Sequence, residues 1–156
     1  MDTYAPEFLR LTKAFHQHGV CYILVGGFAV NKHGFNRTTA DVDVYLEDTK
    51  ANRRSLIDAL EAMGYGRFEP LMHAPLVAGF SEIMMDDGIY ADLMTQIKGL
   101  RQEDFKEHYD AAIVAEIDGS PVRFLSLNHL ISTKEAAGRP KDLLDIEELK
   151  RLHRPE

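Results

Sequence analysis

Residues 21–46 have the sequence CYILVGGFAVNKHGFNRTTADVDVYL, which predicts a strand, a glycine turn, a short helix and a second strand. The apolar run over residues 21–25 stops at Gly26 and Gly27, and a helix is expected over residues 28–34. Glycines let backbone amides approach an anion closely, and a helix that begins after them directs its positive end toward that anion. The turn therefore predicts a phosphate-binding position.

The second strand of this stretch has two acidic residues, Asp41 and Asp43. Side chains on a strand alternate between its faces, so the two carboxylates are expected to share one face, while Val42, Val44 and Leu46 occupy the buried face. Neighbouring carboxylates repel each other unless a cation lies between them. Hard oxygen ligands suit Mg²⁺ or Mn²⁺, so the pair predicts a site for one of these ions.

The order of these motifs resembles that of the minimal nucleotidyltransferases of the DNA polymerase beta superfamily. In that superfamily, Gly-Gly or Gly-Ser is followed by Asp-x-Asp and then by a third acid on a later strand. The resemblance implies an α+β fold with mixed α/β character, in which helices flank a mixed β-sheet and further helices follow at the carboxyl end. It also implies that Arg37 and Thr38, just before the acids, contact a triphosphate.

Asp92 is the expected third acid. It lies among apolar neighbours on a strand predicted over residues 89–94, where an unpaired carboxylate would be costly to bury. Asp86 and Asp87 are the competing candidates, but aspartate before Gly88 is explained by a hairpin turn between this strand and the preceding one.

The remaining patterns predict helices over residues 6–18 and 49–63 and a hairpin over residues 112–125. Two more helices are expected on either side of Gly138. The second of these has a stripe of apolar residues that is expected to face the core: Leu143, Leu144, Ile146, Leu149 and Leu152.

The string LISTKEAAGRPKDLLD, residues 130–145, resembles the tail of one branch of the same superfamily. That branch includes aminoglycoside and lincosamide nucleotidyltransferase-like proteins and the nucleotidyltransferase components of abortive-infection toxin-antitoxin systems. With this resemblance, Lys134 and Lys141 become candidates for holding triphosphate or pyrophosphate. Asp142 and Asp145 are expected to pair locally with basic residues.

Length and composition set bounds on the whole chain. Its 156 residues, 45% of them hydrophobic, predict a single domain over 1–156, with a core over 19–125 and a helical part over 126–156. A net charge of −7 argues against nonspecific DNA binding. The single cysteine, Cys21, is expected in a buried strand and excludes an internal disulfide. No apolar run approaches the ~18 residues of a membrane span, and there is no signal-peptide pattern, so a cytoplasmic protein is expected.

The function implied by the resemblance is transfer of a nucleoside monophosphate from an NTP such as ATP to an acceptor hydroxyl, with release of pyrophosphate. Asp41, Asp43 and Asp92 would hold two Mg²⁺ ions for this reaction. The acceptor stays open between a small molecule such as an antibiotic, a tRNA end and a protein. A homodimer or a partner protein could complete the site of so small a chain.

The same residues are compatible with two other interpretations. The chain could be a non-catalytic nucleotide-binding or protein-interaction module, such as an antitoxin or a regulatory component. Glycosyltransferases also use Asp-x-Asp to hold a metal on a nucleotide sugar, but they need a longer nucleotide-sugar domain, and Asp92 would then have no role.

Overall fold

The computed structural model describes residues 4–36, 39, 41–72, 80–85 and 88–154. The helices are α1 (Pro6–Gln17), α2 (Gly26–Lys32), α3 (Lys50–Ala62), α4 (Phe105–Ala111), α5 (Leu127–Ala137) and α6 (Pro140–Leu152), with the short 3-10 turns η1 (Glu69–Met72) and η4 (Gln102–Asp104). The strands are β1 (Tyr22–Val25), β2 (Val42–Leu46), β3 (Phe80–Met84), β4 (Tyr90–Met94), β5 (Ile113–Ile117) and β6 (Ser120–Phe124). Within these described residues, no helix has the length and apolar character needed to cross a membrane.

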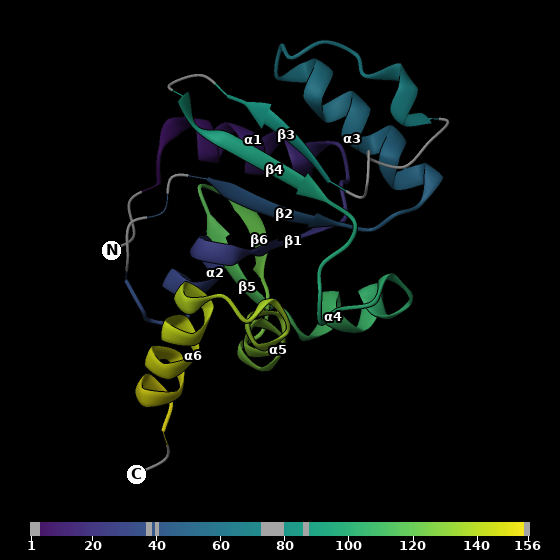
Figure 1. Cartoon of the computed structure of the whole chain (residues 1–156). Coiled ribbons are helices and arrows are strands. Elements are labelled where there is room, and N and C mark those ends of the chain that lie inside the picture. Colours follow the sequence, from purple (N-terminus) through teal and green to yellow (C-terminus); the bar gives the residue numbers. More distant parts are fainter. Residues whose placement is uncertain (1–3, 37–38, 40, 73–79, 86–87, 155–156) are drawn as a thin grey trace.

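The strands form one mixed sheet in the order β3-β4-β2-β1-β6-β5 (Figure 1). Pairing is parallel between β2 and β4 and between β1 and β6, and antiparallel between the other neighbours. Helices lie on both sides of the sheet, and α5 and α6 follow at the carboxyl end. The predicted α+β class, with a mixed sheet flanked by helices, is confirmed.

Two hydrophobic clusters, one on each face of the sheet, form the core. The first joins α1 and α3 to the sheet and includes Phe8, Val44 and Leu60. The second joins α2, α4, α5 and α6 to the opposite face and includes Tyr45 and Leu130. Because Val44 and Tyr45 are consecutive on β2, their separation into different clusters shows the strand alternation that also sets the direction of Asp43.

The predicted apolar stripe on α6 is only partly correct. Ile146 and Leu149 are buried, but Leu143, Leu144 and Leu152 are 56%, 54% and 42% exposed. The helix packs on one side, mainly against α5, so the face that meets other elements is narrower than the stripe. Apolar spacing in the sequence does not show how many neighbours a helix has.

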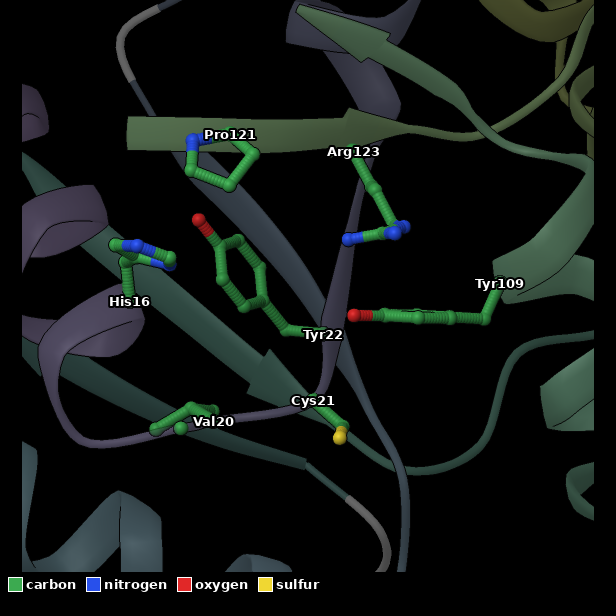
Figure 2. A pocket seen from close by; sticks show the side chains of 8 residues that line it. His16, Val20, Cys21, Tyr22, Tyr109, Pro121 and Arg123 are labelled. Atoms are coloured by element: carbon green, nitrogen blue, oxygen red, sulfur yellow. The ribbon is translucent and has the colours of Figure 1, made fainter. Parts of the chain in front are cut away.

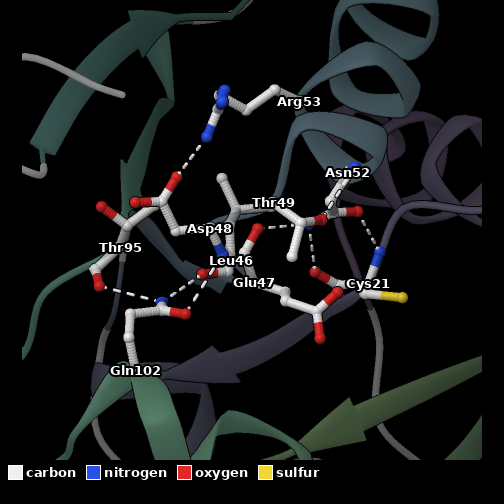
Figure 3. A network of polar contacts seen from close by, with 9 residues as sticks. All are labelled: Cys21, Leu46, Glu47, Asp48, Thr49, Asn52, Arg53, Thr95 and Gln102. Atoms are coloured by element: carbon white, nitrogen blue, oxygen red, sulfur yellow. Dashed lines mark hydrogen bonds and ion pairs between the residues drawn. The ribbon is translucent and has the colours of Figure 1, made fainter. Parts of the chain in front are cut away.

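Asn52 on α3 joins the adjacent ends of β1 and β2 (Figure 3). Its side-chain oxygen accepts a hydrogen bond from the Cys21 amide at 2.7 Å, and its side-chain nitrogen donates to the carbonyls of Cys21 and Glu47 at 2.9 and 2.8 Å. Cys21 itself lies just before β1 and is half-buried. The prediction that it is a buried strand residue is wrong.

Gln102 performs the same task where the parallel strands β2 and β4 diverge (Figure 3). Its side-chain nitrogen donates to the carbonyls of Leu46 and Thr95 at 2.7 and 2.9 Å, and its side-chain oxygen accepts from the Asp48 amide at 3.1 Å. These bonds satisfy backbone groups that the sheet no longer pairs. They also hold the relative position of the two strands that have the predicted acids.

Candidate active site

Three carboxylates lie side by side across neighbouring strands. Asp43 of β2 is the register partner of Asp92 of β4, and Asp92 is in turn the partner of Glu82 of β3. Laterally paired residues point to the same face of a sheet, which here is the face covered by α2, α5 and α6. The sheet thus forms a row of three acids with Asp92 in the middle.

Asp41 is exposed and lies just before β2, which begins at Val42. It lines a cavity of about 410 Å³ together with Asp43 and Asp92. In the described part of the chain, however, no three His, Cys, Asp or Glu side chains stand close enough to hold a metal ion. Asp41, Asp43 and Asp92 therefore line one cavity, but their carboxylates do not converge on a single point.

Burial and mutual repulsion raise the pKa values of the paired acids. Burial is the main reason that the pKa of Asp92 rises to about 6, and the hydrogen bond with Asp43 and the charges of Asp43 and Asp41 add to it. The pKa of Asp43 is also raised, mainly by burial and then by the charge of Asp41, although the bond from Asp92 and nearby lysines oppose the rise. Acids with such shifts are typical of functional sites.

One oxygen of the Asp43–Asp92 pair has the properties of a cation ligand. Asp92 Oδ1 is buried, and within the described residues it has no hydrogen-bond partner. A buried acceptor is rarely left without one, and a divalent cation would satisfy it and relieve the repulsion between the acids. The chemistry of this donor set therefore fits a hard divalent metal.

Gly26 leaves room for this arrangement. Its φ is +63°, and a Cβ built on it would overlap Asp43 Oδ2. The helix α2 begins at Gly26, two residues earlier than predicted, and Gly26 lines the cavity beside the acids. The glycine turn and the acid pair are therefore in direct contact.

Three other residues near the glycine turn are predicted to bind the nucleotide: Gly27, Arg37 and Thr38. A Cβ on Gly27 would overlap Thr39 Oγ1, so this buried glycine packs against the loop before β2 and does not line the cavity. Arg37 and Thr38 lie outside the described residues, and so does the predicted turn at Asp86 and Asp87.

Gly26→Ala is expected to lower the transfer activity that the sequence resemblance implies by about a hundredfold, because the new methyl group displaces the Asp43 carboxylate. Steady-state turnover and the free energy of unfolding are the measurements. Gly66→Ala is the matched control, since Gly66 has a φ of +90° with open space around its Cβ position. Equal activity losses in the two variants would show that backbone strain, not contact with Asp43, is responsible.

Basic side chains also line this cavity. Lys134 from α5, Arg139 and Lys141 from the start of α6, and Lys98 from the loop after β4 all line it. The charges of Lys134 and Lys141 lower the pKa of Asp43, which shows that they act on the acid pair through space. Basic side chains therefore line the same cavity as the acids, and Asp142 lines it beside them.

Lys134 is held by buried aspartates of α6. Its Nζ lies 3.1 Å from Asp145 Oδ2 and 3.4 Å from Asp142 Oδ1, and its side chain is 8% exposed. Arg139 also donates to Asp142, at 2.6 Å. Burial alone would raise the pKa of Asp142, but the Arg139 bond and the Lys134 charge hold it below its usual value. Lys134 and Arg139 are thus both held by buried carboxylates of α6.

Sequence reasoning did not single out Glu82, Lys98 and Arg139 as site residues. Glu82 joins the acid row only through the pairing of β3 with β4, which the chain order does not specify. Lys98 lies in the loop after β4 and lines the cavity. The available signal was strand alternation for Glu82 and proximity to Asp92 in sequence for Lys98.

The shifted pKa of Asp92 predicts a pH dependence in metal-free buffer. Between 3.8 and about 6, the folded protein binds a proton that the unfolded chain has released, so this group's contribution to stability falls as the pH rises through that window. We expect the difference in unfolding free energy between wild type and Asp92→Asn to follow this trend. Chemical denaturation at several pH values checks it. The unfolding free energy of Asp110→Asn, a change at an exposed position of α4, should follow the same pH dependence as that of wild type.

The mixed sheet, the glycine turn and the acid row together define a nucleotidyltransferase fold. Residues 7–154 match the family described as nucleotidyltransferase of unknown function (DUF6036), and the chain belongs to this family. No curated protein sequence matches it.

Solved structures share the fold at low sequence identity. The lincosamide antibiotic adenylyltransferase LnuA, solved with lincomycin bound, aligns with a TM-score of 0.63 at 16% identity over 97% of this chain and 99% of that one. A nucleotidyltransferase from Thermotoga maritima aligns at 0.56 and 17% identity over 96% of each chain. ANT(2")-Ia in complex with adenylyl-2"-tobramycin aligns at 0.52 and 16% identity over 92% of this chain and 86% of that one.

Proposed function

We propose that this nucleotidyltransferase moves a nucleoside monophosphate from an NTP to an acceptor hydroxyl in the presence of a divalent metal, releasing pyrophosphate. The observation that carries the proposal is the lateral register of Asp43 with Asp92 directly beside Gly26. In the proposed complex, a divalent cation held by the acids binds one side of the triphosphate, and basic groups stabilise its other side. The cavity is lined by Asp41, Asp43 and Asp92, which would hold the cation, and by basic side chains that suit the phosphates.

Asp43 and Asp92, with Asp41 at the rim, are the residues that would hold Mg²⁺ or Mn²⁺. Magnesium usually takes only one or two protein carboxylates and completes its shell with water and substrate phosphates, so three aspartates that share a cavity without converging are compatible with loading by a metal–nucleotide complex. When bound, two such ions would supply a lowered acceptor pKa and neutralisation of phosphate charge.

The residues of the chain have separate tasks in the proposed reaction. The acceptor oxygen forms a bond to the α-phosphorus as the bond from the α-phosphorus to the oxygen that bridges to the β-phosphate breaks. Pyrophosphate leaves with that oxygen, and the acceptor proton passes to solvent water. Asp92 orients the acceptor hydroxyl, whereas Asp43 faces both the acceptor and the triphosphate. Gly26 admits the triphosphate next to Asp43. Lys141 and Lys98, which are exposed and line the cavity, stabilise the departing pyrophosphate, and Lys134 contributes its charge while paired with Asp142 and Asp145.

The proposed acceptor hydroxyl belongs to a small molecule, a tRNA end or a protein. Lincomycin and tobramycin, present in two of the similar structures, are the first small-molecule acceptors to test, with tRNA and protein as the other classes. A homodimer or a partner protein would extend a cavity that is open on the side of exposed Asp41 and Lys141.

The decisive experiment titrates each of the four NTPs into the protein with and without Mg²⁺, and follows the unfolding temperature and pyrophosphate release. Wild type is compared with Asp43→Asn and with Asp110→Asn, a matched change on α4 outside the cavity. We expect one or more NTPs to stabilise wild type and Asp110→Asn in a magnesium-dependent way, and this stabilisation to disappear in Asp43→Asn.

The outcomes separate catalysis from binding. Pyrophosphate release with an acceptor supports the transfer reaction. Magnesium-dependent binding without transfer to any small molecule, tRNA or protein acceptor would favour a regulatory nucleotide-binding module. Stabilisation that persists in Asp43→Asn would contradict the proposed position of the nucleotide.

A further inference from the structure

The short helix α4 has two buried side chains, Phe105 and His108. Phe105 packs on Tyr45 of β2, with 5.3 Å between the ring centroids. His108 packs on His129 of α5. A helix of seven residues is marginally stable by itself, so α4 keeps its structure through contacts with the rest of the chain. His108 is therefore one of the few side chains on which the position of α4 depends.

A further contact of α4 borders a cavity. The Arg123 guanidinium of β6 lies over the ring of Tyr109, with Cζ 4.0 Å from the ring centroid (Figure 2). Both side chains line a cavity of about 220 Å³, which leaves this end of α4 incompletely packed. Segments with few buried apolar contacts open more readily than the rest of a domain. The docking of α4 thus depends mainly on its buried face.

His108 is buried without a partner for either ring nitrogen. The residue is 6% exposed, and within the described residues neither Nδ1 nor Nε2 has a hydrogen-bond partner. Its ring is nearly perpendicular to that of His129, with 4.3 Å between the centroids. The hydroxyl of Tyr45, the residue under Phe105, is also buried without a partner there. Buried polar groups are normally hydrogen-bonded, so α4 is docked at a cost in free energy.

The charges around His108 favour a different position for a protonated ring. Asp104 at the end of η4 and the exposed Glu107 of α4 attract a positive charge, whereas a protonated His129 would repel one. Burial outweighs this attraction and lowers the pKa of His108 below 6.5. A protonated His108 is therefore more stable outside the buried position, where water hydrates it and both carboxylates stay near in sequence.

His129 connects this contact to the start of α5. Ser126 caps that helix, because its Oγ accepts a hydrogen bond from the His129 amide at 3.4 Å. The same Oγ lies 2.9 Å from His129 Nδ1. Lys134, which lines the acidic cavity, is on the same helix. A change in the contact between the two histidines therefore acts on the cap of the helix that positions Lys134.

We propose that the His108–His129 contact is an acid-sensitive joint: when His108 binds a proton from solvent, its ring leaves the space beside His129, α4 detaches from the sheet and the start of α5 loosens. Loss of the proton restores docking. Below pH 6.5, each further unit favours the detached form by up to about tenfold, because the free ring binds a proton that the buried ring excludes. This device is independent of the proposed transfer reaction.

The test measures amide hydrogen exchange of the full chain by NMR at pH 7.5 and pH 5.0, expressed as protection factors. We expect protection in α4 and the first turn of α5 to fall about tenfold more than protection in α3, which packs on the opposite face of the sheet. The imidazole of His108 should titrate with a midpoint below 6.5, and the amide signals at the start of α5 should shift with the same midpoint.

Variants connect the effect to His108. His108→Phe keeps a ring in the space and cannot take up a proton, so the additional loss of protection in α4 should disappear. His16→Gln, a change at an exposed histidine of α1, should retain it. If His108→Phe does not fold, the titration of wild type decides. Equal losses in α3 and α4, an additional loss that persists in His108→Phe, or a His108 midpoint at or above 6.5 would overturn the proposal.

Discussion

Asp43→Asn is expected to reduce nucleotidyl transfer on the order of a thousandfold, equivalent to ~4 kcal/mol of transition-state stabilisation, because it removes the carboxylate shared by both halves of the proposed site. Asp43 is paired in register with Asp92 and contacts the position of the missing Cβ on Gly26. The asparagine keeps the shape of the side chain but has no charge. Single-turnover transfer at saturating Mg²⁺ is the measurement.

The same variant should fold normally. Because burial and the charge of Asp41 raise the pKa of Asp43, its ionised form is unfavourable in the metal-free protein. We therefore expect the unfolding free energy in metal-free buffer to stay within about 1 kcal/mol of wild type. Asp110→Asn is the matched control and should retain both activity and stability. Full transfer activity in Asp43→Asn would remove this residue from the mechanism.

Lys134→Met is expected to have the largest effect on stability, about 3 kcal/mol. Loss of one partner from a buried ion pair typically costs ~3–5 kcal/mol, because the remaining charge stays buried with less compensation. Arg139 still pairs with Asp142 after the loss of Lys134, so the expected cost is at the lower end of this range. Here the lysine lies against two aspartates whose side chains are at most 4% exposed. Chemical denaturation gives the unfolding free energy directly.

Two further variants separate the cause from a loss of packing. Lys106→Met removes an exposed lysine that is paired with Asp110 on α4, and it should change stability by less than ~0.5 kcal/mol. Lys134→Met combined with Asp145→Asn should recover part of the lost stability, since one buried charge is removed with the cation. A single variant as stable as wild type would show that the pair contributes nothing net.

Much of the fold could be predicted because its signals are local. The alternation of residues 42–46 gave the correct buried face of β2, and the glycine and hairpin positions gave the correct strand order along the chain. Asp92 was selected from its apolar neighbours, and the structure places it opposite Asp43. Its role, like those of Asp41, Lys134 and Lys141, stays a prediction.

The missed features depend on contacts between distant segments. Glu82 enters the acid row through a register that only the assembled sheet defines. The exposure of Leu143 and Leu144 follows from the number of helices that pack on α6, which spacing within one helix cannot specify. Lys134 was expected at the phosphates, but whether its charge is shared with aspartates depends on how α5 docks against α6.

Asp43 and Lys134 line the same cavity but are far apart in the sequence, and this affects the nascent protein. Asp43 and Lys134 are separated by roughly 90 residues, so at ~5–20 residues per second the ribosome makes Asp43 at least several seconds before Lys134. During that interval β2 presents its carboxylates without the basic side of the cavity. Docking of α5 and α6 then closes the core over Tyr45 and brings Lys134 and Lys141 close enough to lower the pKa of Asp43.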